Sequence, residues 1–370
     1  MAVVGRREWR YTRSLPLTFE ASVCMRDSPG DWPKRIEALE RRLTRPTQAL
    51  VEAITAVEGP LVVLGAGGKM GPTLAVLAQR AAQEAGHPLQ VIAVSRFSSA
   101  AARTWLEAQG VATRRANLLE RSELDSLPDA SHVVYLVGRK FGTAEEPVQT
   151  WVTNTVVPTY VCERYSGTPI TALSTGNVYP WTIATAGGSR ESDSLGPLGE
   201  YAHAAVARER VFEFFARKNR TPMTLVRLNY AVELRYGVLV DIARKVFRGE
   251  PVDVTTGYLN CIWQGDANET ILRSFSLAAS PPAVINLTSE ETLSVRQLAG
   301  RFGELLGREP HFVGEEAKMA LLSNAAKCSE TFGAPNTRLD QVIEWTAAWI
   351  RDGGPSLDQP THFEVRDGGY

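Results

Sequence analysis

From residue 60 onward, short apolar runs alternate with segments in which apolar residues recur at helical spacing. The apolar runs are too short for helices and are bounded by glycine, proline and polar residues, which is typical of buried strands. The pattern predicts strands at 61–64, 89–95, 111–118, 132–138 and 169–175, and helices at 72–86, 99–110, 121–127 and 146–165. Because strands that are largely apolar throughout and alternate with helices are typical of a parallel sheet covered on both faces, the expected fold is α/β, a doubly wound parallel sheet.

A glycine-rich turn follows the first predicted strand and opens the first helix of this series. It reads LVVLGAGGKMG, residues 61–71. Glycines at a strand–helix junction let the backbone approach a pyrophosphate, whose charge then lies at the helix N-terminus. A glycine-rich turn alone is weak evidence, but its position at the first junction of the series strengthens the interpretation. The predicted dinucleotide-binding residues of this turn are Gly65, Gly67, Gly68, Lys69, Met70 and Gly71.

The end of the second strand bears on which dinucleotide is bound. An enzyme that prefers NAD usually carries an acidic residue there, whereas this chain has Ser95 followed by Arg96. A small residue and a cation suit a 2′-phosphate, so the sequence favours NADP over NAD. The alternative is that Arg96 stacks on the adenine or is a solvated surface cation. Further predicted cofactor contacts come from later strand ends and one helix, at Asn117, Leu118, Val137, Gly138 and Asn154.

Beyond about residue 230 the alternation loosens. Helices predicted at 237–251, 294–310 and 339–350 are separated by short strands such as 283–288, which indicates a smaller lobe. Four parts are expected: an N-terminal extension that is irregular at first and then partly helical (1–58), a Rossmann-type dinucleotide-binding domain (59–229), a mainly C-terminal substrate-binding lobe with late core elements (230–352) and a tail (353–370).

The composition of the chain limits the kinds of molecule that the protein is expected to bind. The 370 residues carry a formal net charge of −1, which gives no electrostatic reason to expect nucleic acid or an anionic membrane. No apolar run approaches the roughly 20 residues that span a bilayer. The four cysteines (Cys24, Cys162, Cys261 and Cys328) are far apart, which predicts reduced, mostly buried thiols and no metal site. We therefore expect a cytoplasmic protein.

Several motifs occur in order along the chain, each at an expected strand or helix. They are the turn Gly65-x-x-Gly68-x-x-Gly71, Asn154 within WVTNTVVP, STGNVYP at 174–180, Tyr201 with Glu209 eight residues later, and LVRLNY at 225–230. With these motifs, roughly residues 60–350 resemble an extended short-chain dehydrogenase/reductase of the NAD-dependent epimerase/dehydratase family. STGNVYP is similar to that family's SSxxVYG.

The resemblance implies roles for particular residues. In that family a Ser or Thr polarises the substrate oxygen and a Tyr moves its proton, and the matching residues here are Thr175 and Tyr201. The residues themselves agree, because a hydroxyl at the carboxyl edge of a parallel strand opens into the ligand crevice and a phenol can act as a general acid. The alternative is that Thr175 only bonds to backbone and Tyr201 only anchors its helix. Expected substrate-binding residues are Asn177, Asn229, Tyr230, Arg235 and Tyr236; by resemblance, a homodimer is expected.

The main departure from the family pattern is Ala205, where the family carries a lysine. That lysine holds the nicotinamide ribose and lowers the pKa of the phenol, which is about 10 when unperturbed. Three substitutes are visible: Lys140 in the loop after the fourth strand, Arg208 two turns further along the same helical face, and His203, which points about 200° around the helix. Lys140 is preferred because its loop opens into the crevice. The alternative for Arg208 is an ion pair with an acid from elsewhere in the fold, and for Lys140 and His203 it is a solvated position.

Together these features predict an NAD(P)-dependent oxidoreductase or epimerase, a dehydratase included. It is expected to act by hydride transfer on a hydroxyl or carbonyl of a small carbohydrate-like substrate, with Tyr201 as the acid/base. No diphosphate clamp for a nucleotide sugar is identified. The rival interpretation is a non-catalytic NAD(P)-binding sensor or regulatory protein of the same fold. Loss of the lysine favours the sensor, and retention of both Thr175 and Tyr201 opposes it.

Overall fold

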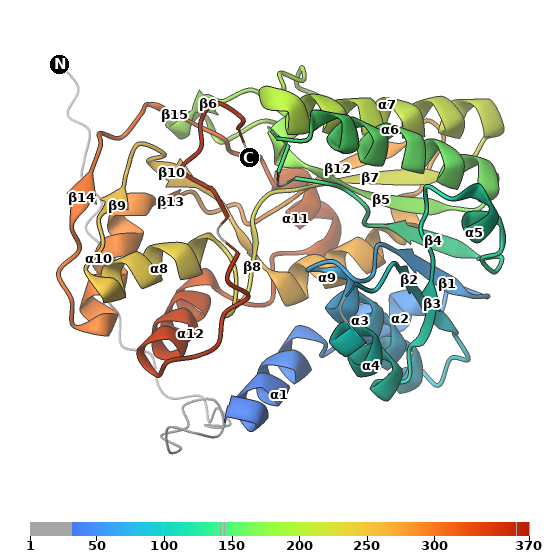
Figure 1. Ribbon diagram of the computed structural model, residues 1–370, viewed down its shortest axis with the longest axis horizontal. Coiled ribbons are helices and arrows are strands. Elements are labelled where there is room, and N and C mark those ends of the chain that lie inside the picture. The colour runs from blue at the N-terminus through green and yellow to red at the C-terminus, as the bar shows by residue number, and fades with distance from the viewer. Residues whose placement is uncertain (1–31, 99, 141, 144, 360, 370) are drawn as a thin grey trace.

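A seven-stranded parallel sheet runs through the centre of the molecule (Figure 1). This computed structural model describes residues 32–98, 100–140, 142–143, 145–359 and 361–369, so the irregular start predicted for the N-terminal extension lies outside the described residues up to residue 31. Every pairing in the sheet is parallel, which confirms the doubly wound α/β fold. The strand order is β12–β7–β5–β4–β1–β2–β3, with bounds β1 (Leu61–Leu64), β2 (Val91–Ser95), β3 (Ala112–Arg115), β4 (His132–Tyr135), β5 (Ile170–Thr175), β7 (Met223–Leu228) and β12 (Ala283–Leu287).

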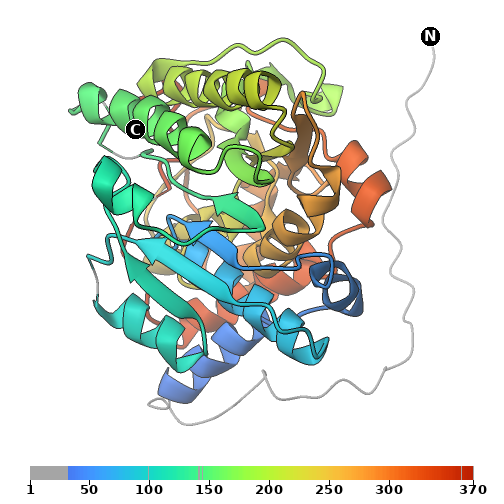
Figure 2. The ribbon, with the colours of Figure 1, turned by 90° about the vertical axis from the view of Figure 1, so that its right-hand side faces the viewer.

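Helices cover both faces of the sheet, because successive strand residues point to opposite sides. Leu61 and Val63 of β1 face one cluster of buried side chains, and Val62 and Leu64 face the other. The first face is covered by α2 (Gln48–Ile54), α3 (Gly71–Glu84) and α9 (Gln264–Arg273), the second by α5 (Arg121–Asp125), α6 (Pro147–Arg164) and α7 (Gly199–Asn219), and α4 (Ala100–Ala108) joins β2 to β3. Helices α6 and α7 lie side by side over the second face (Figures 1 and 2).

The chain order reverses at β1, which pairs with β2 on one side and with β4 on the other. In an open parallel sheet such a reversal opens a crevice outside the carboxyl ends of the strands, and ligands bind there. The residues that follow β1, β2, β4 and β5 therefore lie around one crevice. This is where the sequence places the glycine-rich turn, Ser95, Val137 and Thr175.

A second lobe lies beside the sheet (Figure 1). Its core combines α1 (Trp32–Leu43), α8 (Val238–Arg248), α10 (Val295–Leu306) and α12 (Leu339–Arg351). Short paired strands connect these helices: β8 (Ala231–Val232) with β11 (Ile262–Trp263), β9 (Val252–Asp253) with β14 (Phe312–Val313), and β10 (Tyr258–Leu259) with β13 (Leu293–Ser294). β6 (Thr182–Ile183) pairs with β15 (Met319–Ala320), and α11 (Ala326–Phe332) packs beside β12. The two short helices of the extension therefore join different cores, α1 in this lobe and α2 against the sheet.

Residues 361–369, which we call the C-terminal strap, run back from α12 toward the start of α7 (Figure 1). Both the backbone N–H and the hydroxyl of Thr361 donate to one carboxylate oxygen of Asp241, at 2.9 and 2.6 Å. Phe363 is buried in the core of the second lobe. At the far end, a Cβ placed on Gly199 would overlap the backbone of Gly368, so these two glycines allow a direct backbone contact. The strap thus spans from the second lobe to the helix that carries Tyr201.

Candidate active site

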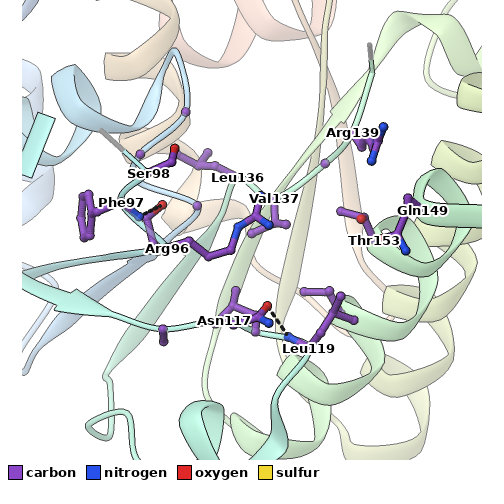
Figure 3. Close-up of a pocket in the computed structure, with 18 of the residues that line it drawn as sticks. Arg96, Phe97, Ser98, Asn117, Leu119, Leu136, Val137, Arg139, Gln149 and Thr153 are labelled. Carbon is purple, nitrogen blue, oxygen red and sulfur yellow. Dashed lines mark hydrogen bonds between the residues drawn. The ribbon is translucent and has the colours of Figure 1, made fainter. Parts of the chain in front are cut away.

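A cavity of about 480 Å³ lies at the carboxyl ends of β1, β2 and β4 (Figure 3). It is lined by three glycines of the predicted turn, and these are Gly65, Gly67 and Gly68. Other predicted cofactor residues line it as well: Ser95, Arg96, Asn117, Leu118, Val137 and Gly138. These nine of the thirteen predicted dinucleotide-binding residues therefore surround one open cavity of the size expected for a cofactor site, whereas Lys69, Met70, Gly71 and Asn154 do not line it.

The glycines of the turn serve different purposes. Gly65 has φ +86°, a backbone conformation that favours glycine. A Cβ on Gly71 would lie 2.5 Å from the Cα of Ala66, so this position must be glycine for α3 to pack under the turn. A Cβ on Gly68 would meet only the carbonyl of Gly65 at 3.4 Å, an ordinary contact. Gly68 therefore leaves open the space beside the helix start that a phosphate would use.

The start of α3 is suited to an anion. Met70 precedes the helix without a side-chain hydrogen bond to its first turn, Pro72 occupies one of the first two positions, and the first turn holds no acidic residue. The first N–H groups of the helix, which have no partner within it, and the positive end of the helix dipole are thus available to an anion. Together with the open side of Gly68, this fits the pyrophosphate of a dinucleotide. Lys69 and Met70 point elsewhere, Lys69 toward the second lobe and Met70 into the core.

The lining of the cavity contains residues that the sequence did and did not identify. The Arg96 side chain reaches into the cavity from the end of β2 (Figure 3). The side-chain oxygen of Asn117 accepts from the N–H of Leu119 at 3.3 Å, which fixes the turn after β3. Gln149 and Thr153, one turn apart on α6, also line the cavity. Sequence analysis missed them because it weighed only Asn154 on that helix, and their spacing is the signal that would have revealed them.

Asn154 is fully buried beneath the cavity and holds the side chain of Arg208. Its amide oxygen accepts from a guanidinium nitrogen of Arg208 at 2.6 Å, and the same nitrogen donates to the carbonyl of Val137 at 3.4 Å. Within the described part of the chain, the Nε of Arg208 has no hydrogen-bond partner. Arg208 thus folds back toward the loop after β4, as the helical spacing suggested, and lies on the cofactor side of the crevice. Neither residue lines the cavity, so their contact with a cofactor stays a prediction.

Thr175 and Tyr201 lie on adjoining elements at the crevice. Thr175 ends β5, is buried, and its hydroxyl accepts from the N–H of Asn177 at 3.2 Å. Tyr201 is in the first turn of α7 and is buried as well. Burial raises the pKa of Tyr236 to about 12, and Asp241 and Tyr201 add to the rise. The start of α7, which carries Tyr201, meets the strap where Gly199 contacts Gly368.

The two lysines nearest the crevice converge on one segment of the second lobe. The Lys69 ammonium donates to the carbonyl of Ala231 at 2.5 Å and lies 4.0 Å from the centre of the Tyr236 ring. The Lys140 ammonium lies 5.9 Å from the centre of the Tyr230 ring and 3.5 Å from the carbonyl of Thr361. Loss of hydration lowers the pKa of Lys69 to about 7 and that of Lys140 to about 8.

His203, the third substitute considered for the lysine missing at position 205, bonds to its own helix. One ring nitrogen lies 2.8 Å from the carbonyl of Gly199, and the residue is exposed. Its direction away from the crevice agrees with the helical geometry. Of the three substitutes considered, two therefore remain at the crevice, Arg208 below the cofactor cavity and Lys140 toward the second lobe.

A buried polar network fixes the end of β5. Glu209 forms an ion pair with Arg227 at 2.7 Å and accepts from the Ser174 hydroxyl at 2.5 Å. Arg227 also donates to the hydroxyl of Tyr179 at 2.7 Å, and Tyr179 donates to Asn286 at 2.8 Å. A buried pair held by this many hydrogen bonds orients its surroundings more than it adds stability. Glu209, which the motif pointed out, thus sets the strand that presents Thr175.

The remaining predicted substrate residues are spread out. Asn177 borders a cavity of only about 10 Å³ that the strap closes with Val365, Arg366 and Gly368. Asn229 is buried and donates to Asn260 at 2.7 Å. Arg235 is held by Glu233 at 3.2 Å and faces Glu40 of α1 at 3.8 Å. The contribution of each to substrate binding stays a prediction.

Two broader features bear on the sequence expectations. Cys162, Cys261 and Cys328 are buried and form no disulfide, whereas Cys24 lies outside the described residues. In the described part of the chain, no helix combines the length and the apolar character that crossing a membrane requires.

The comparisons with known proteins agree with this architecture. Residues 61–237 match the model of the NAD dependent epimerase/dehydratase family. The UDP-glucose 4-epimerase of Thermotoga maritima, solved with UDP-glucose, has a TM-score of 0.65 at 19% identity, covering 79% of this chain and 98% of that chain. The UDP-glucuronic acid 4-epimerase of Bacillus cereus, solved with NAD, has a TM-score of 0.66 at 15% identity, covering 79% and 96%. An epimerase of Methanothermobacter thermautotrophicus has a TM-score of 0.67 at 17% identity, covering 82% and 95%. No curated protein matches the sequence.

These likenesses and the strand order define the fold, a doubly wound parallel sheet of the Rossmann type like that of the solved epimerases, with its crevice at β1. The NAD dependent epimerase/dehydratase family, whose model residues 61–237 match, is the family that the sequence motifs indicated, and it agrees with the expected class of enzyme.

Proposed function

We propose that this protein is an NAD(P)-dependent oxidoreductase or epimerase, a dehydratase included, that acts by hydride transfer on a hydroxyl or carbonyl of a carbohydrate-like substrate. The observation that carries the proposal is the open cavity at the glycine-rich turn, together with Thr175 at the end of β5 and Tyr201 in the first turn of α7, the helix that packs against β5. The family match supports a dinucleotide in that cavity.

In this proposal, different residues around the cavity bind different parts of the dinucleotide. The start of α3 and the open side of Gly68 take the pyrophosphate. Arg96 and Asn117 lie at the adenosine end, where Arg96 favours a 2′-phosphate and hence NADP. Arg208, held by Asn154, offers its Nε below the loop of Val137. When bound, the nicotinamide ring supplies the acceptor and donor of the hydride.

Tyr201 and Thr175 carry the proton chemistry in this proposal. The Thr175 hydroxyl holds the reacting oxygen of the substrate, and the Tyr201 phenol takes or returns the proton of that oxygen. Lys140 supplies the positive field that the phenolate needs, in place of a lysine at Ala205. Its support is the position of Lys140 between Tyr230 and the strap, because the strap also contacts the start of α7, which carries Tyr201.

The structural neighbours suggest the substrate type. Their names describe epimerases of UDP-glucose and UDP-glucuronic acid, so a sugar or sugar derivative is the substrate class that we propose. An epimerase returns the hydride to the same carbon, whereas a dehydrogenase releases the oxidised product. We also propose that the protein is a cytoplasmic homodimer.

The dimer proposal rests on apolar side chains on the outer surface of two neighbouring helices. Val148 and Trp151 on α6 and Phe214 on α7 are exposed, at 69%, 38% and 56% of their surface. A second copy packed on these helices would cover them. Light scattering should give the mass of a dimer for the wild type and of a monomer for Phe214→Glu, and a monomeric wild type would exclude this interface.

A non-catalytic NAD(P)-binding sensor is the second candidate. Ala205 favours it, because the family's lysine is missing, and the strap lies across the substrate side of the crevice. A sensor needs the cofactor cavity and has no use for the Thr175 and Tyr201 pair.

Nucleotide binding is the direct test of the proposal. We expect purified protein to bind NADH or NADPH, measured by fluorescence titration, and Gly68→Ala to bind at least about tenfold more weakly because its methyl group occupies the phosphate approach. Gly300→Ala is the matched control, since a Cβ there meets nothing within 4 Å. Binding of neither nucleotide to the wild type would overturn the proposed function.

A further inference from the structure

A second cavity, of about 320 Å³, lies at the carboxyl end of β12, the edge strand of the sheet. It shares no lining residue with the dinucleotide cavity. Its walls come from β11, from the segment that follows β12 and from the start of α12. The volume is large enough for a small organic molecule, and nothing in the proposed reaction uses it.

A smaller cavity, of about 20 Å³, adjoins the second one, because Ile262 and Pro335 line both. This volume holds one water-sized group, such as the ammonium end of a larger molecule. Its lining includes Asp266 of α9 and Thr288, the residue after β12. One ligand can therefore place its head group in the small cavity and its body in the larger one.

The polar groups of the small cavity lack a donor. Thr288 is only 2% exposed, and in the part of the chain that the structure describes its hydroxyl has no hydrogen-bond partner. Such a buried hydroxyl is costly unless something pairs with it. The two carboxylate oxygens of Asp266 accept from the N–H and the hydroxyl of Thr337, at 2.8 and 3.3 Å, and each oxygen keeps a further lone pair. A group with several N–H donors would satisfy both residues.

The charges that line the two cavities do not cancel. Each cavity holds one arginine that is already paired with a carboxylate: Arg273 with Glu269 at 3.5 Å, and Arg338 with Asp340 at 3.2 Å. One more carboxylate lines each cavity, Asp266 in the small one and Glu291 in the larger one. Among the described residues, neither of these two forms an ion pair. The site therefore carries two negative charges without a cation.

The lining fits an organic cation better than a metal ion. Within the described ranges, no three His, Cys, Asp or Glu side chains come together in a way that would hold a metal. Much of the wall is apolar, with Ile262, Pro335 and Leu339, and suits an aliphatic chain. Burial raises the pKa of the Asp266 carboxyl to about 6, and Glu269 adds to the rise. A cation beside the carboxylate would oppose both effects.

We propose that the two cavities form one binding site for a linear aliphatic diamine. One ammonium group occupies the small cavity and donates to the Asp266 carboxylate and the Thr288 hydroxyl. The aliphatic chain runs along Ile262 and Pro335, and the second ammonium group pairs with Glu291 in the larger cavity. The two positive charges of the ligand match the two carboxylates. This site is additional to the proposed function and does not depend on it.

The test is calorimetric titration of the full chain with putrescine and cadaverine, each compared with the monoamine of its length, n-butylamine or n-pentylamine. The better diamine should bind at least about tenfold more tightly than its monoamine, because the second ammonium group gains a charge-assisted hydrogen bond. Glu291→Gln should remove this preference. Glu290→Gln is the matched control and should keep it, since Glu290 is exposed and lines neither cavity.

Thr288→Val tests the small cavity separately. Valine fills the same space without the hydroxyl, so the variant should unfold at the wild-type temperature or above while its affinity for the diamine falls by about tenfold. Equal affinity for diamine and monoamine, or binding of neither, would overturn the inference. So would a preference that survives in Glu291→Gln, or wild-type affinity in Thr288→Val. Dinucleotide titration of the same samples reports on the proposed function independently of these outcomes.

Discussion

The two sides of the crevice are built in different ways. The dinucleotide side follows the ends of β1, β2 and β4 in chain order, is lined by glycines and short loops, and contains an open cavity of about 480 Å³. The substrate side combines the start of α7, the segment after β7, the loop of Lys140 and the strap at the far end of the chain. Its cavity beside Asn177 measures only about 10 Å³. The residues of the dinucleotide side thus come from short segments at the ends of neighbouring strands, whereas those of the substrate side come from segments far apart in the chain.

The sharpest way to test that division is Tyr201→Phe. If the phenol is the acid/base, turnover should fall by a factor on the order of 10² to 10⁴ because the proton transfer loses its catalyst. Dinucleotide affinity should stay at the wild-type value, since Tyr201 does not line the dinucleotide cavity. Gly68→Ala should show the reverse pattern, weak dinucleotide binding with the acid/base intact.

The readouts for Tyr201→Phe are steady-state turnover of the substrate and fluorescence titration of the dinucleotide. Full activity of Tyr201→Phe would show that another group moves the proton. Loss of both activity and dinucleotide binding would show that the two sides of the crevice are not separable.

The strap provides the next test. Gly368 has φ +79°, and a Cβ there would overlap the carbonyl of Leu198. Gly368→Val should therefore lower the stability by an amount on the order of 3 kcal/mol, through backbone strain and overpacking together. The substrate KM should change because the strap leaves the start of α7, while dinucleotide affinity should not.

Gly353→Val is the matched control for this effect. Gly353 has a similar φ of +77°, but a Cβ there meets nothing within 4 Å. Thermal unfolding should show a smaller loss for this variant, and its KM should equal that of the wild type. Equal losses would mean that the strap contact contributes nothing.

The same contrast explains what the sequence could predict. The strands, the glycine-rich turn and the residues Ser95, Arg96 and Asn117 were found because their signals are local: apolar runs, glycines at one junction, and strand ends. All of these line one cavity or one sheet. The position of Arg208 could also be predicted from the sequence, because helical spacing alone places it on the same face of the helix as Tyr201.

Other features depend on packing between distant segments. Lys69 was predicted as part of the cofactor turn, yet its ammonium crosses to Ala231, 162 positions further along the chain. The strap was only a tail in the sequence, since residues 361–369 show no periodic pattern. From the sequence, helix α2 was predicted to be part of the N-terminal extension. In the structure, its Leu50 and Ile54 pack against one face of the sheet. None of these contacts has a sequence signal at short range.

A smaller effect concerns the sheet beneath both sides. His132 of β4 is buried against Phe275, with ring centres 3.8 Å apart, and one ring nitrogen lies 3.0 Å from the Thr171 hydroxyl. Burial lowers the pKa of His132 to about 3. Because the unfolded chain protonates near its ordinary value of about 6.5 and the folded chain does not, stability should fall as the pH drops below that value, by about 2 kcal/mol at pH 5.

Urea unfolding at pH 7 and pH 5 measures this loss. His132→Leu should remove most of the difference between the two pH values. An unchanged difference would place the acid sensitivity elsewhere in the fold.

The smallest expected effect sharpens the dinucleotide side itself. Arg96→Ala should weaken NADP binding by about tenfold, the value of one charge-assisted hydrogen bond, and leave NAD binding nearly unchanged. Equal losses for the two nucleotides would mean that Arg96 stacks on the adenine, because that contact is common to both. No loss for either would make Arg96 a solvated cation, although it lines the cavity. Since NADP differs from NAD only in the 2′-phosphate, the ratio of the two affinities isolates the one contact in question, and it does so without any knowledge of the substrate.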